Sequence, residues 1–443
     1  MRRPGYDMNV FRERRQMLAN RAKGSAVIVA AHPEMIRNND VHHSYRQDSN
    51  MFYLTGFEEP DSILVFRPGL TPETVLFVRP KDVERETRDG FRYGPEGAER
   101  EYKVDKAYLI SEFDKVIVEL LKPVEKVFYR WNTDRSFDEK MLTVLDQVRS
   151  SLGRTGRGHL PVHDSSELIG EMRLIKSPGE IETMRKACEI SALGHIEAMK
   201  FVRPGVNERQ VHGVLVGSFL MQNATREGYG TIVASGSAAT TLHYTFNDQP
   251  CREGDLLLID AGAEYQYFTG DITRTFPVNG KFSVPQKKVY QAVLDIQKQL
   301  CTAVKPGMLF KSMQERTIEA LTDVMIELNL LKGARQTLIE SNAFKKYYMH
   351  GVGHWLGMDV HDCGLHIVNG EPRKLEQGMS FTIEPGLYIP ADDTSAPAEF
   401  RGIGIRIEDN IVVTAGGSEN LTIKAPKEIA DMEAIIGTGS RWS

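Results

Sequence analysis

Two aspartates in neighbouring strand-like segments are the residues of this chain best suited to chemistry. Asp260 ends an apolar run, and Asp271 begins a run rich in β-branched residues. The short polar stretch between the runs predicts a β-hairpin that turns between Tyr265 and Gln266 and places Asp260 directly opposite Asp271. Two carboxylates about 5 Å apart repel each other, so the pair needs a shared proton or a cation. Two divalent metal ions bridged by carboxylates, about 3.5–4 Å apart, fit this spacing.

Three more potential metal ligands lie in the C-terminal third of the chain. His354 follows a glycine-rich segment, Glu384 ends a strand-like run, and Glu408 lies in a segment with a period of two. In that last segment Arg406 and Glu408 share one face and isoleucines the other, and a buried charged face needs a partner for its charge. The set of two aspartates, one histidine and two glutamates is rich in oxygen, which favours harder divalent ions such as manganese over a thiolate-type zinc site.

In order and in local context, these five ligands resemble the dinuclear metal site of the pita-bread metallopeptidases. The resemblance is closest to the bacterial-type aminopeptidase P family, the Xaa-Pro aminopeptidases, and it covers nearly the whole chain. Five ligands in five separate contexts make it far more specific than a single motif. The other segments that carry the resemblance are 45–50, 53–57, 172–178, 242–245, 271–282, 354–357, 359–362 and 384–388.

The resemblance implies a two-domain architecture. The expected fold is an α/β N-terminal domain over residues 1–172, followed by an α+β pita-bread catalytic domain over residues 173–443. The second domain would have a curved antiparallel sheet flanked by helices, with a pseudo-twofold. The sequence pattern agrees, because helix and strand signals alternate in the first part. Ser177, Pro178 and Glu180 then form a capping box that predicts the start of a long helix.

The resemblance also implies a role for each ligand. Asp271 and Glu408 would bridge both metals, Asp260 would complete one metal, and His354 and Glu384 would complete the other. Glu384 is also expected to accept the proton from the attacking water. The expected cofactors are two divalent metal ions per chain, with Mn²⁺ as the first choice and Co²⁺, Fe²⁺ or Zn²⁺ as alternatives.

Five further side chains are expected to act on the substrate. His243 and His361 would donate hydrogen bonds to the developing oxyanion, and His350 would line the pocket for the proline ring. Arg406 would help to close that pocket or orient the metal cluster. Tyr388 would pack near the proline ring, although a plain core aromatic is an equal alternative for it. An ordinary solvated or core histidine is the alternative for each of the three histidines.

Three positions concern the substrate amine and the subunit contact. Asp40 falls where the family has an aspartate that meets the free amine of the substrate. A tryptophan that reaches a neighbouring subunit's active site in the close bacterial relative is absent here, and Phe91 is the candidate replacement. An arginine expected shortly before Glu171 is also missing. These departures affect subunit contact and substrate length, but not the metal chemistry.

The composition is that of an ordinary soluble globular protein. The 443 residues are 26% charged and 41% apolar, with a net charge of −5 that offers no basic face for nucleic acid. The N-terminus lacks the apolar core of a signal peptide, and no run reaches transmembrane length. Four scattered cysteines are typical of reduced thiols. We therefore expect a cytoplasmic protein without nucleic-acid or membrane partners, and the resemblance adds a homo-oligomer, either a dimer or a tetramer.

The ligand set and the family resemblance together imply an Xaa-Pro aminopeptidase, which would remove the N-terminal residue of a peptide with proline in second place through a metal-bridging hydroxide. The nearest alternative is a prolidase, which cuts only Xaa-Pro dipeptides and must recognise a free carboxylate beyond the proline. A methionine aminopeptidase fits the large N-terminal domain less well, and creatinase-like hydrolysis without metal would require lost ligands. A non-catalytic pita-bread module that binds peptides or histones is an alternative of another class, but such relatives typically lack several ligands.

Overall fold

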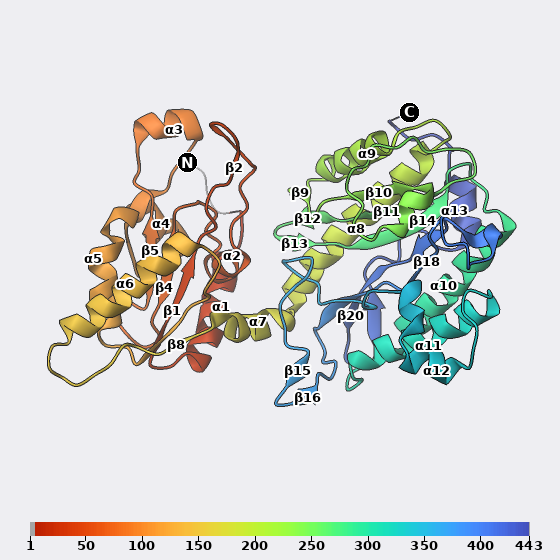
Figure 1. Ribbon diagram of the computed structural model, residues 1–443. Coiled ribbons are helices and arrows are strands. Elements are labelled where there is room, and N and C mark those ends of the chain that lie inside the picture. Colours follow the sequence, from red (N-terminus) through yellow and green to blue (C-terminus); the bar gives the residue numbers. More distant parts are fainter. Residues whose placement is uncertain (1–4, 443) are drawn as a thin grey trace. The chain divides into compact units, whose positions relative to one another are not determined.

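The computed structural model of the chain describes residues 5–442 (Figure 1). Residue contacts divide the chain into an N-terminal unit, Met1–Met172, and a C-terminal unit, Arg173–Ser443. Each unit has a buried apolar core of its own, which is the defining property of a domain.

The N-terminal unit is built around a six-stranded mixed sheet with the strand order β6-β5-β4-β1-β7-β8. Its central strands β4 and β5 are buried along their whole length because helices cover both faces. The sheet strands are β1 (Ser25–Ala30), β4 (Ile63–Phe66), β5 (Thr74–Val78), β6 (Lys106–Leu109), β7 (Lys126–Phe128) and β8 (Val162–His163), and β2 (Ile36–Asn38) and β3 (Val41–His42) form a separate hairpin. The helices are α1 (Met8–Arg21), α2 (Ser49–Thr55), α3 (Val83–Asp89), α4 (Gly94–Tyr102), α5 (Phe113–Leu121), α6 (Arg135–Ser151) and α7 (Ser165–Leu174), the last of which runs across the boundary between the units.

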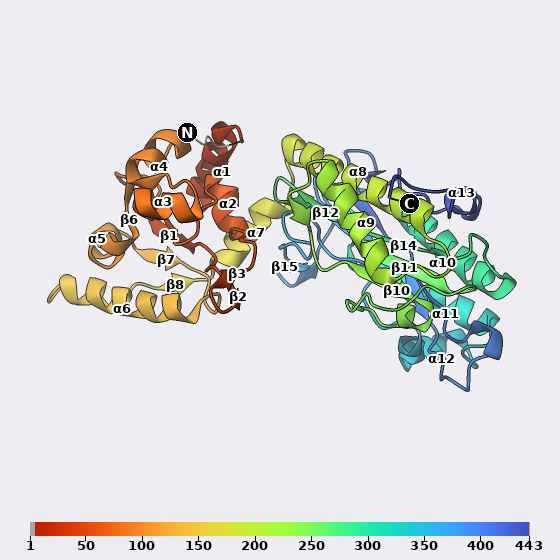
Figure 2. The same cartoon turned by 90° about the horizontal axis from the view of Figure 1, so that it is seen from above.

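The C-terminal unit consists of antiparallel strands flanked by helices. Its two main sheets have the orders β10-β11-β14 and β17-β20-β21. Helices α8 and α9 pack on the first sheet, and α10 contacts the second (Figures 1 and 2). The strands are β9 (Arg226–Glu227), β10 (Ile232–Ser235), β11 (Leu256–Ala261), β12 (Ala263–Tyr265), β13 (Phe268–Thr269), β14 (Ile272–Pro277), β15 (Ile367–Val368), β16 (Glu371–Pro372), β17 (Ser380–Ile383), β18 (Gly386–Tyr388), β19 (Gly404–Arg406), β20 (Asp409–Val413) and β21 (Ser418–Asn420). The helices are α8 (Pro178–Phe201), α9 (Glu208–Met221), α10 (Val284–Ala303), α11 (Lys311–Glu327), α12 (Arg335–Glu340) and α13 (Ile429–Ile435).

Helix α8 begins at the predicted capping box. The Ser177 hydroxyl accepts a hydrogen bond from the Glu180 N–H, and the Glu180 carboxylate accepts one from the Ser177 N–H at 2.8 Å. Pro178 occupies the first turn, where its missing N–H costs nothing. The predicted helix start is therefore confirmed.

The predicted register of the aspartate hairpin is wrong. Asp260 pairs with Thr273 and not with Asp271. The turn lies one residue later than expected, at Gln266 and Tyr267, whose φ angles are +49° and +69°. Two consecutive residues with positive φ give the tight turn that matches the twist of a hairpin. Asp260 and Asp271 are consequently diagonal neighbours on one face, not direct partners.

A close approach of two glycines makes this diagonal arrangement possible. A Cβ atom at Gly262 would lie 1.7 Å from the carbonyl oxygen of Gly270. Gly262 lies between β11 and β12, and Gly270 lies between β13 and β14. Only residues without side chains allow such contact, so the glycines bring the two aspartate-bearing segments together.

Candidate metal centre and active site

The five predicted metal ligands line one cavity of about 450 Å³ in the C-terminal unit. Asp260 lies in β11, and Asp271 immediately precedes β14. Glu384 directly follows β17, and Glu408 directly precedes β20. His354 lies beside β17, because the next residue, Trp355, forms an isolated antiparallel β-bridge with Phe381 of that strand. Four of the five ligands thus lie at or next to strand ends.

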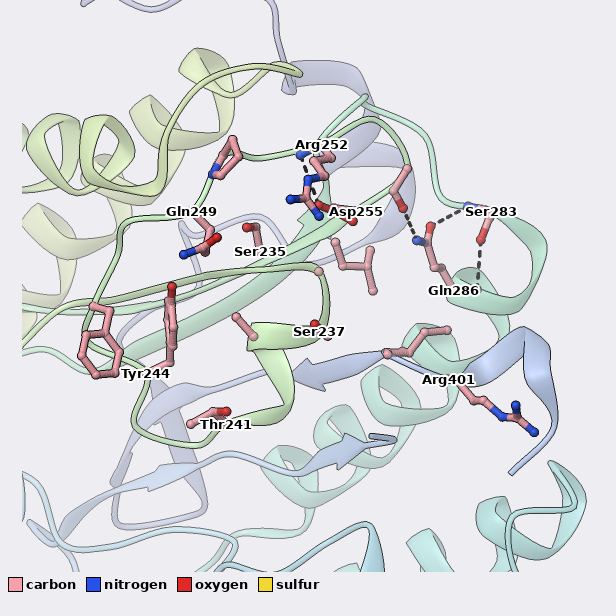
Figure 3. Close-up of a pocket in the computed structure, with 18 of the residues that line it drawn as sticks. Ser235, Ser237, Thr241, Tyr244, Gln249, Arg252, Asp255, Ser283, Gln286 and Arg401 are labelled. Carbon is pink, nitrogen blue, oxygen red and sulfur yellow. Dashed lines mark hydrogen bonds between the residues drawn. The ribbon is translucent and has the colours of Figure 1, made fainter. Parts of the chain in front are cut away.

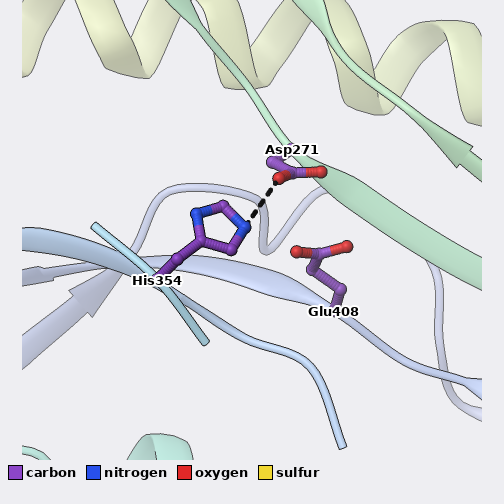
Figure 4. A group of neighbouring side chains, drawn as sticks. All are labelled: Asp271, His354 and Glu408. Carbon is purple, nitrogen blue, oxygen red and sulfur yellow. Dashed lines mark ion pairs between the residues drawn. The ribbon is translucent and has the colours of Figure 1, made fainter. Parts of the chain in front are cut away.

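The ligand atoms of Asp271, His354 and Glu408 lie within 4.8 Å of one another (Figure 4). The Nε2 atom of His354 is 3.4 Å from Asp271 Oδ2 and 3.6 Å from Glu384 Oε1. Its Nδ1 atom is 3.0 Å from the Trp355 carbonyl oxygen. A carbonyl oxygen only accepts, so Nδ1 carries a proton, and Nε2, on the side of the carboxylates, is the atom that would bind a metal ion. This is the tautomer that a metal-binding histidine adopts.

The cluster contains more carboxylates than cationic side chains, and this imbalance favours the binding of cations. Burial raises the pKa of Asp271, that of Glu384 to about 7, and that of Glu408 well above its usual range. Burial alone would lower the pKa of His354, but Asp271 and Glu384 raise it to about 9. Four carboxylates, two of them buried and two half-buried, with one imidazole and one guanidinium are short of positive charge. Divalent cations among them would restore the balance, so these residues fit a metal centre.

Buried side chains fix the backbone around the bridging candidates. The guanidinium of Arg274, which is fully buried, donates to the carbonyl oxygens of Glu408 at 2.6 Å and Thr273 at 2.9 Å, and to Asp409 Oδ1 at 2.7 Å. The Thr273 hydroxyl donates to Glu408 Oε2 at 2.6 Å. Strands β14 and β20 are therefore joined beside the cluster, although they belong to different sheets.

His350, Tyr388 and Arg406 form one hydrogen-bonded chain. His350 Nδ1 is 2.7 Å from the Gly351 carbonyl oxygen and therefore carries the proton, and Nε2 is 2.8 Å from the Tyr388 hydroxyl, which must donate to it. Burial lowers the pKa of His350 to about 4, so the ring is neutral. Arg406 donates to the Tyr388 hydroxyl at 3.0 Å and to Asp260 Oδ2 at 2.7 Å. This series of hydrogen bonds thus links His350 to Asp260, a metal-ligand candidate.

The other two histidines line the same cavity. The His361 ring lies edge-on to the His354 ring, with centroids 4.4 Å apart. Burial lowers the pKa of His361, and the charge of His354 lowers it further. His243 is exposed on a loop between β10 and β11. In residues 5–442 no side chain or backbone group forms a hydrogen bond with its ring.

Two family models match the chain. One is "Metallopeptidase family M24" over residues 182–415, and the other is "Aminopeptidase P, N-terminal domain" over residues 11–129. The chain belongs to metallopeptidase family M24. With the aminopeptidase P domain at its N-terminus, it is a metallo-aminopeptidase that uses divalent metal. The predicted family, fold and enzyme class are confirmed.

Individual members of the family are similar over nearly their whole length. The Xaa-Pro aminopeptidase of Haemophilus influenzae is 41% identical over 428 residues, 96% of each chain. The structure of Pseudomonas aeruginosa aminopeptidase PepP aligns with a TM-score of 0.94 at 41% identity, over 98% of both chains. Zinc-substituted Escherichia coli aminopeptidase P in complex with product aligns with a TM-score of 0.93 at 38% identity, over 97% of this chain and 98% of that one. No helix in the described part of this M24 chain is long and apolar enough to cross a membrane.

Tyr229 is a site residue that the sequence did not reveal. Its buried hydroxyl lies 2.7 Å from Asp260 Oδ1 and 2.5 Å from Asp271 Oδ1. A phenol has one proton and can donate to only one carboxylate, so the second short contact again calls for a further proton or a cation. The sequence feature that could have indicated Tyr229 is its position between two glycines, Gly228 and Gly230. One of these, Gly228, approaches Thr269 so closely that a Cβ atom would lie 1.9 Å from its hydroxyl.

Buried polar side chains also hold the histidine loops. Gln314 of α11 accepts hydrogen bonds from the Val352 N–H at 2.6 Å and the Tyr348 hydroxyl at 3.1 Å, close to His350. Beside His361, the carboxylate of Asp362 is held by two buried cations. These are Arg173, at 2.5 Å, and Lys176, at 3.0 Å.

A second cavity of about 880 Å³ lies on the other side of the His243 loop (Figure 3). Leu242, His243 and Thr245 line the metal-site cavity, whereas Thr241 and Tyr244 line this one. Its other lining groups carry both signs of charge, including Arg252 and Asp255. None of the predicted metal ligands lines it.

Two predicted residues belong to the N-terminal unit, whereas the five ligand candidates belong to the C-terminal unit. Asp40 is exposed in the turn between β2 and β3. Phe91 is half-buried, with its ring edge-on to Tyr93 at 4.9 Å and the Lys81 ammonium 4.6 Å from its centroid. The proposed substrate role of Asp40 and the replacement role of Phe91 stay predictions.

Proposed function

We propose that this M24 chain is a dinuclear Xaa-Pro aminopeptidase. The observation that carries the proposal is the convergence of Asp260, Asp271, His354, Glu384 and Glu408 in one cavity, together with three histidines. The name of the Haemophilus influenzae relative supports the same activity at 41% identity. A non-catalytic module is disfavoured because all five ligand candidates are present and face one another.

The proposed cofactors are two divalent ions, with Mn²⁺ as the first choice. Two such ions match the charge of four carboxylates, and the oxygen-rich donor set suits a harder ion. Asp271 and Glu408 would contact both ions, Asp260 one of them, and His354 with Glu384 the other. When bound, the ions would acidify a water molecule and polarise the scissile carbonyl. Glu384 would take the proton from that water on a carboxylate oxygen.

The remaining residues would bind and orient the peptide. His243 and His361 are proposed to donate hydrogen bonds to the carbonyl oxygen as negative charge develops on it. Both ring nitrogens of His350 are already engaged, so this ring offers the substrate a surface and not a donor. A ring surface suits the proline ring, whose nitrogen has no N–H to satisfy. Tyr388 and Arg406 would hold that surface in place.

The charges in the cavity favour an aminopeptidase over a prolidase. A prolidase must bind the free carboxylate of its dipeptide. Among the residues that line this cavity, Arg406 is the one arginine or lysine. Its guanidinium is 4% exposed and already donates to Asp260 and Tyr388. The lowered pKa values of His350 and His361 keep both rings neutral near pH 7, and His354 already faces Asp271 and Glu384. A free carboxylate would therefore find no unengaged arginine or lysine among the lining residues.

Purified protein supplied with Mn²⁺ tests the proposal. We expect cleavage of Xaa-Pro-Xaa tripeptides to exceed that of Xaa-Pro dipeptides, and Xaa-Ala-Xaa peptides to be poor substrates. Equal cleavage of the alanine and proline peptides would contradict the proline specificity. Cleavage confined to dipeptides would establish a prolidase instead. Cytoplasmic location and a dimeric or tetrameric state stay predictions, which fractionation of the source cells and light scattering can check.

A further inference from the structure

The loop that bears His243 has open space on both sides. It runs from Ser235 at the end of β10 to Gln249, with the metal-site cavity on one side and the second cavity on the other (Figure 3). Residues 236–240 pack on the core through the buried Ala239, whereas residues 241–246 lie between the two cavities, where packing fixes the backbone less firmly than it fixes a strand. His243 itself is exposed, and its ring has no hydrogen-bond partner among residues 5–442. Its position must come from the backbone of the loop.

One buried carboxylate contacts this loop at its start, middle and end. Glu208, the first residue of α9, is fully buried. Its Oε1 atom accepts from both the N–H and the hydroxyl of Ser235, each at 2.7 Å. Its Oε2 atom accepts from the Tyr244 hydroxyl and from the Gln249 N–H, each at 2.9 Å. Four donors on a single carboxylate satisfy its charge without a cation.

The contact to Tyr244 sets Glu208 apart from the other anchors of the loop. Asn247 binds β10 through the Val233 N–H at 2.8 Å, and the Asn207 side chain donates to the Asp248 carbonyl oxygen at 2.8 Å. Both of these anchors act near the end of the loop. Tyr244, by contrast, is the immediate neighbour of His243. Tyr244 lines the second cavity and His243 the metal-site cavity, so holding the Tyr244 side chain in place keeps its neighbour His243 turned to the metal site.

We propose that Glu208 is a positioning residue for the reaction, and that it acts through His243. The inference rests on the proposed function, in which His243 donates to the developing oxyanion. Glu208 touches no substrate and no metal-ligand candidate. It holds the loop so that the His243 ring meets the carbonyl oxygen at the required distance, and a displacement of about 1 Å at such a donor can cost about 10²-fold in rate.

Two substitutions weaken the anchor without removing the histidine. Glu208→Gln keeps the shape but faces the Gln249 N–H with another donor. Tyr244→Phe removes the middle contact, together with the longer contact of the same hydroxyl to Asp248 at 3.4 Å. We expect kcat on an Xaa-Pro-Xaa peptide to fall about 10-fold in each variant, within the 10²–10³-fold limit set by loss of one oxyanion donor. KM and the Mn²⁺ affinity should change less than about twofold. Gln222→Ala is the control, because Gln222 lies at the other end of α9 and its side chain donates to Ser218, away from the loop.

A double-mutant cycle separates positioning through His243 from a general structural effect. In a His243→Ala background, Glu208→Gln should change kcat less than about twofold. A full additional loss in that background would overturn the proposal. Unchanged kcat in both single variants would overturn it as well.

Hydrogen exchange of the amides in residues 236–249 measures the anchor without any activity. Protection should fall in Glu208→Gln and Tyr244→Phe and stay unchanged in Gln222→Ala. Unaltered protection in the first two variants would refute the anchor, even if the enzyme proved to have another substrate. If wild-type protein cleaves no Xaa-Pro peptide but the loop still loses protection in the variants, the proposed function fails and the anchor stands without its catalytic role.

Discussion

The amide side chain of Asn410 pairs with the main chain of Asp271. Its Oδ1 atom accepts from the Asp271 N–H at 2.8 Å, and its Nδ2 atom donates to the Asp271 carbonyl oxygen at 2.5 Å. Asn410 lies two residues beyond Glu408 on β20. The segment that begins with Glu408, one bridging candidate, therefore holds the backbone of Asp271, the other. These two hydrogen bonds use only the main chain of Asp271, so its carboxylate can face the cavity.

Replacing Asp271 with asparagine should abolish activity without unfolding the chain. The substitution removes one bridging negative charge but keeps the main-chain contacts with Asn410, so the fold loses little. Elemental analysis should show reduced metal, and circular dichroism should show an unchanged melting profile for the metal-free protein. A fully active wild-type sample with only traces of metal would refute the metal centre itself.

Tyr229→Phe should weaken metal binding. The change deletes only the hydroxyl that contacts Asp260 and Asp271, so both carboxylates lose the group that orients them. Loss of such an outer contact typically costs about 10–100-fold in metal affinity. Isothermal titration with Mn²⁺ measures it directly. Tyr265→Phe, at the half-buried end of β12, is the control, and equal Mn²⁺ affinity in both variants would show that the Tyr229 hydroxyl has no part in the site.

His361→Ala and His354→Ala should separate a donor from a ligand. If His361 donates to the carbonyl oxygen in the transition state, its loss lowers kcat by about 10²–10³ and leaves KM and metal content nearly unchanged. His354→Ala should instead lose metal occupancy at one site. A His361→Ala protein that loses metal to the same degree would reclassify His361 as a ligand or as support for one. An unchanged kcat in His361→Ala would show that His361 has no role in the reaction.

His195 should make the fold less stable as the pH falls below neutrality. This fully buried side chain of α8 contacts the Ala261 carbonyl oxygen at 3.0 Å, and burial lowers its pKa from 6.5 to about 4. The unfolded chain therefore binds a proton before the native state does. The stability due to neutral His195 is complete above about pH 6.5 and declines towards pH 4, by on the order of 3 kcal/mol.

Urea unfolding of metal-free protein between pH 7 and pH 4.5 tests this expectation. His195→Gln keeps a donor for Ala261 but does not titrate. As the pH falls, the free energy of unfolding should decrease more in the wild type than in the variant. Parallel pH profiles for the two proteins would show that His195 does not contribute.

The features that the sequence revealed are those with local signals. Ser177 and Glu180 are three residues apart, so their capping box is visible in the sequence. Asp260 and Glu408 stand out because a carboxylate in an apolar strand needs a partner. The family resemblance then grouped all five ligand candidates, and the structure places them in one cavity.

Other features depended on information that the sequence does not show locally. The hairpin register failed because Gln266 and Tyr267 adopt positive φ, which neither residue type favours. Tyr229 and Glu208 were missed because their partners are distant in the sequence. Tyr229 is separated by 42 residues from Asp271, and Glu208 by 41 residues from Gln249. No short motif records such pairs, and only the folded chain brings them together.

The ligand candidates come from both sides of the α10–α11 pair. Asp260 and Asp271 precede α10, whereas His354, Glu384 and Glu408 follow α11. Metal ions held by these residues would add a noncovalent cross-link between the segments before α10 and after α11, beside the buried hydrogen bonds of Arg274 and Asn410. In a chain nicked between α10 and α11, metal would therefore strengthen the association of the two fragments, and chelation would weaken it.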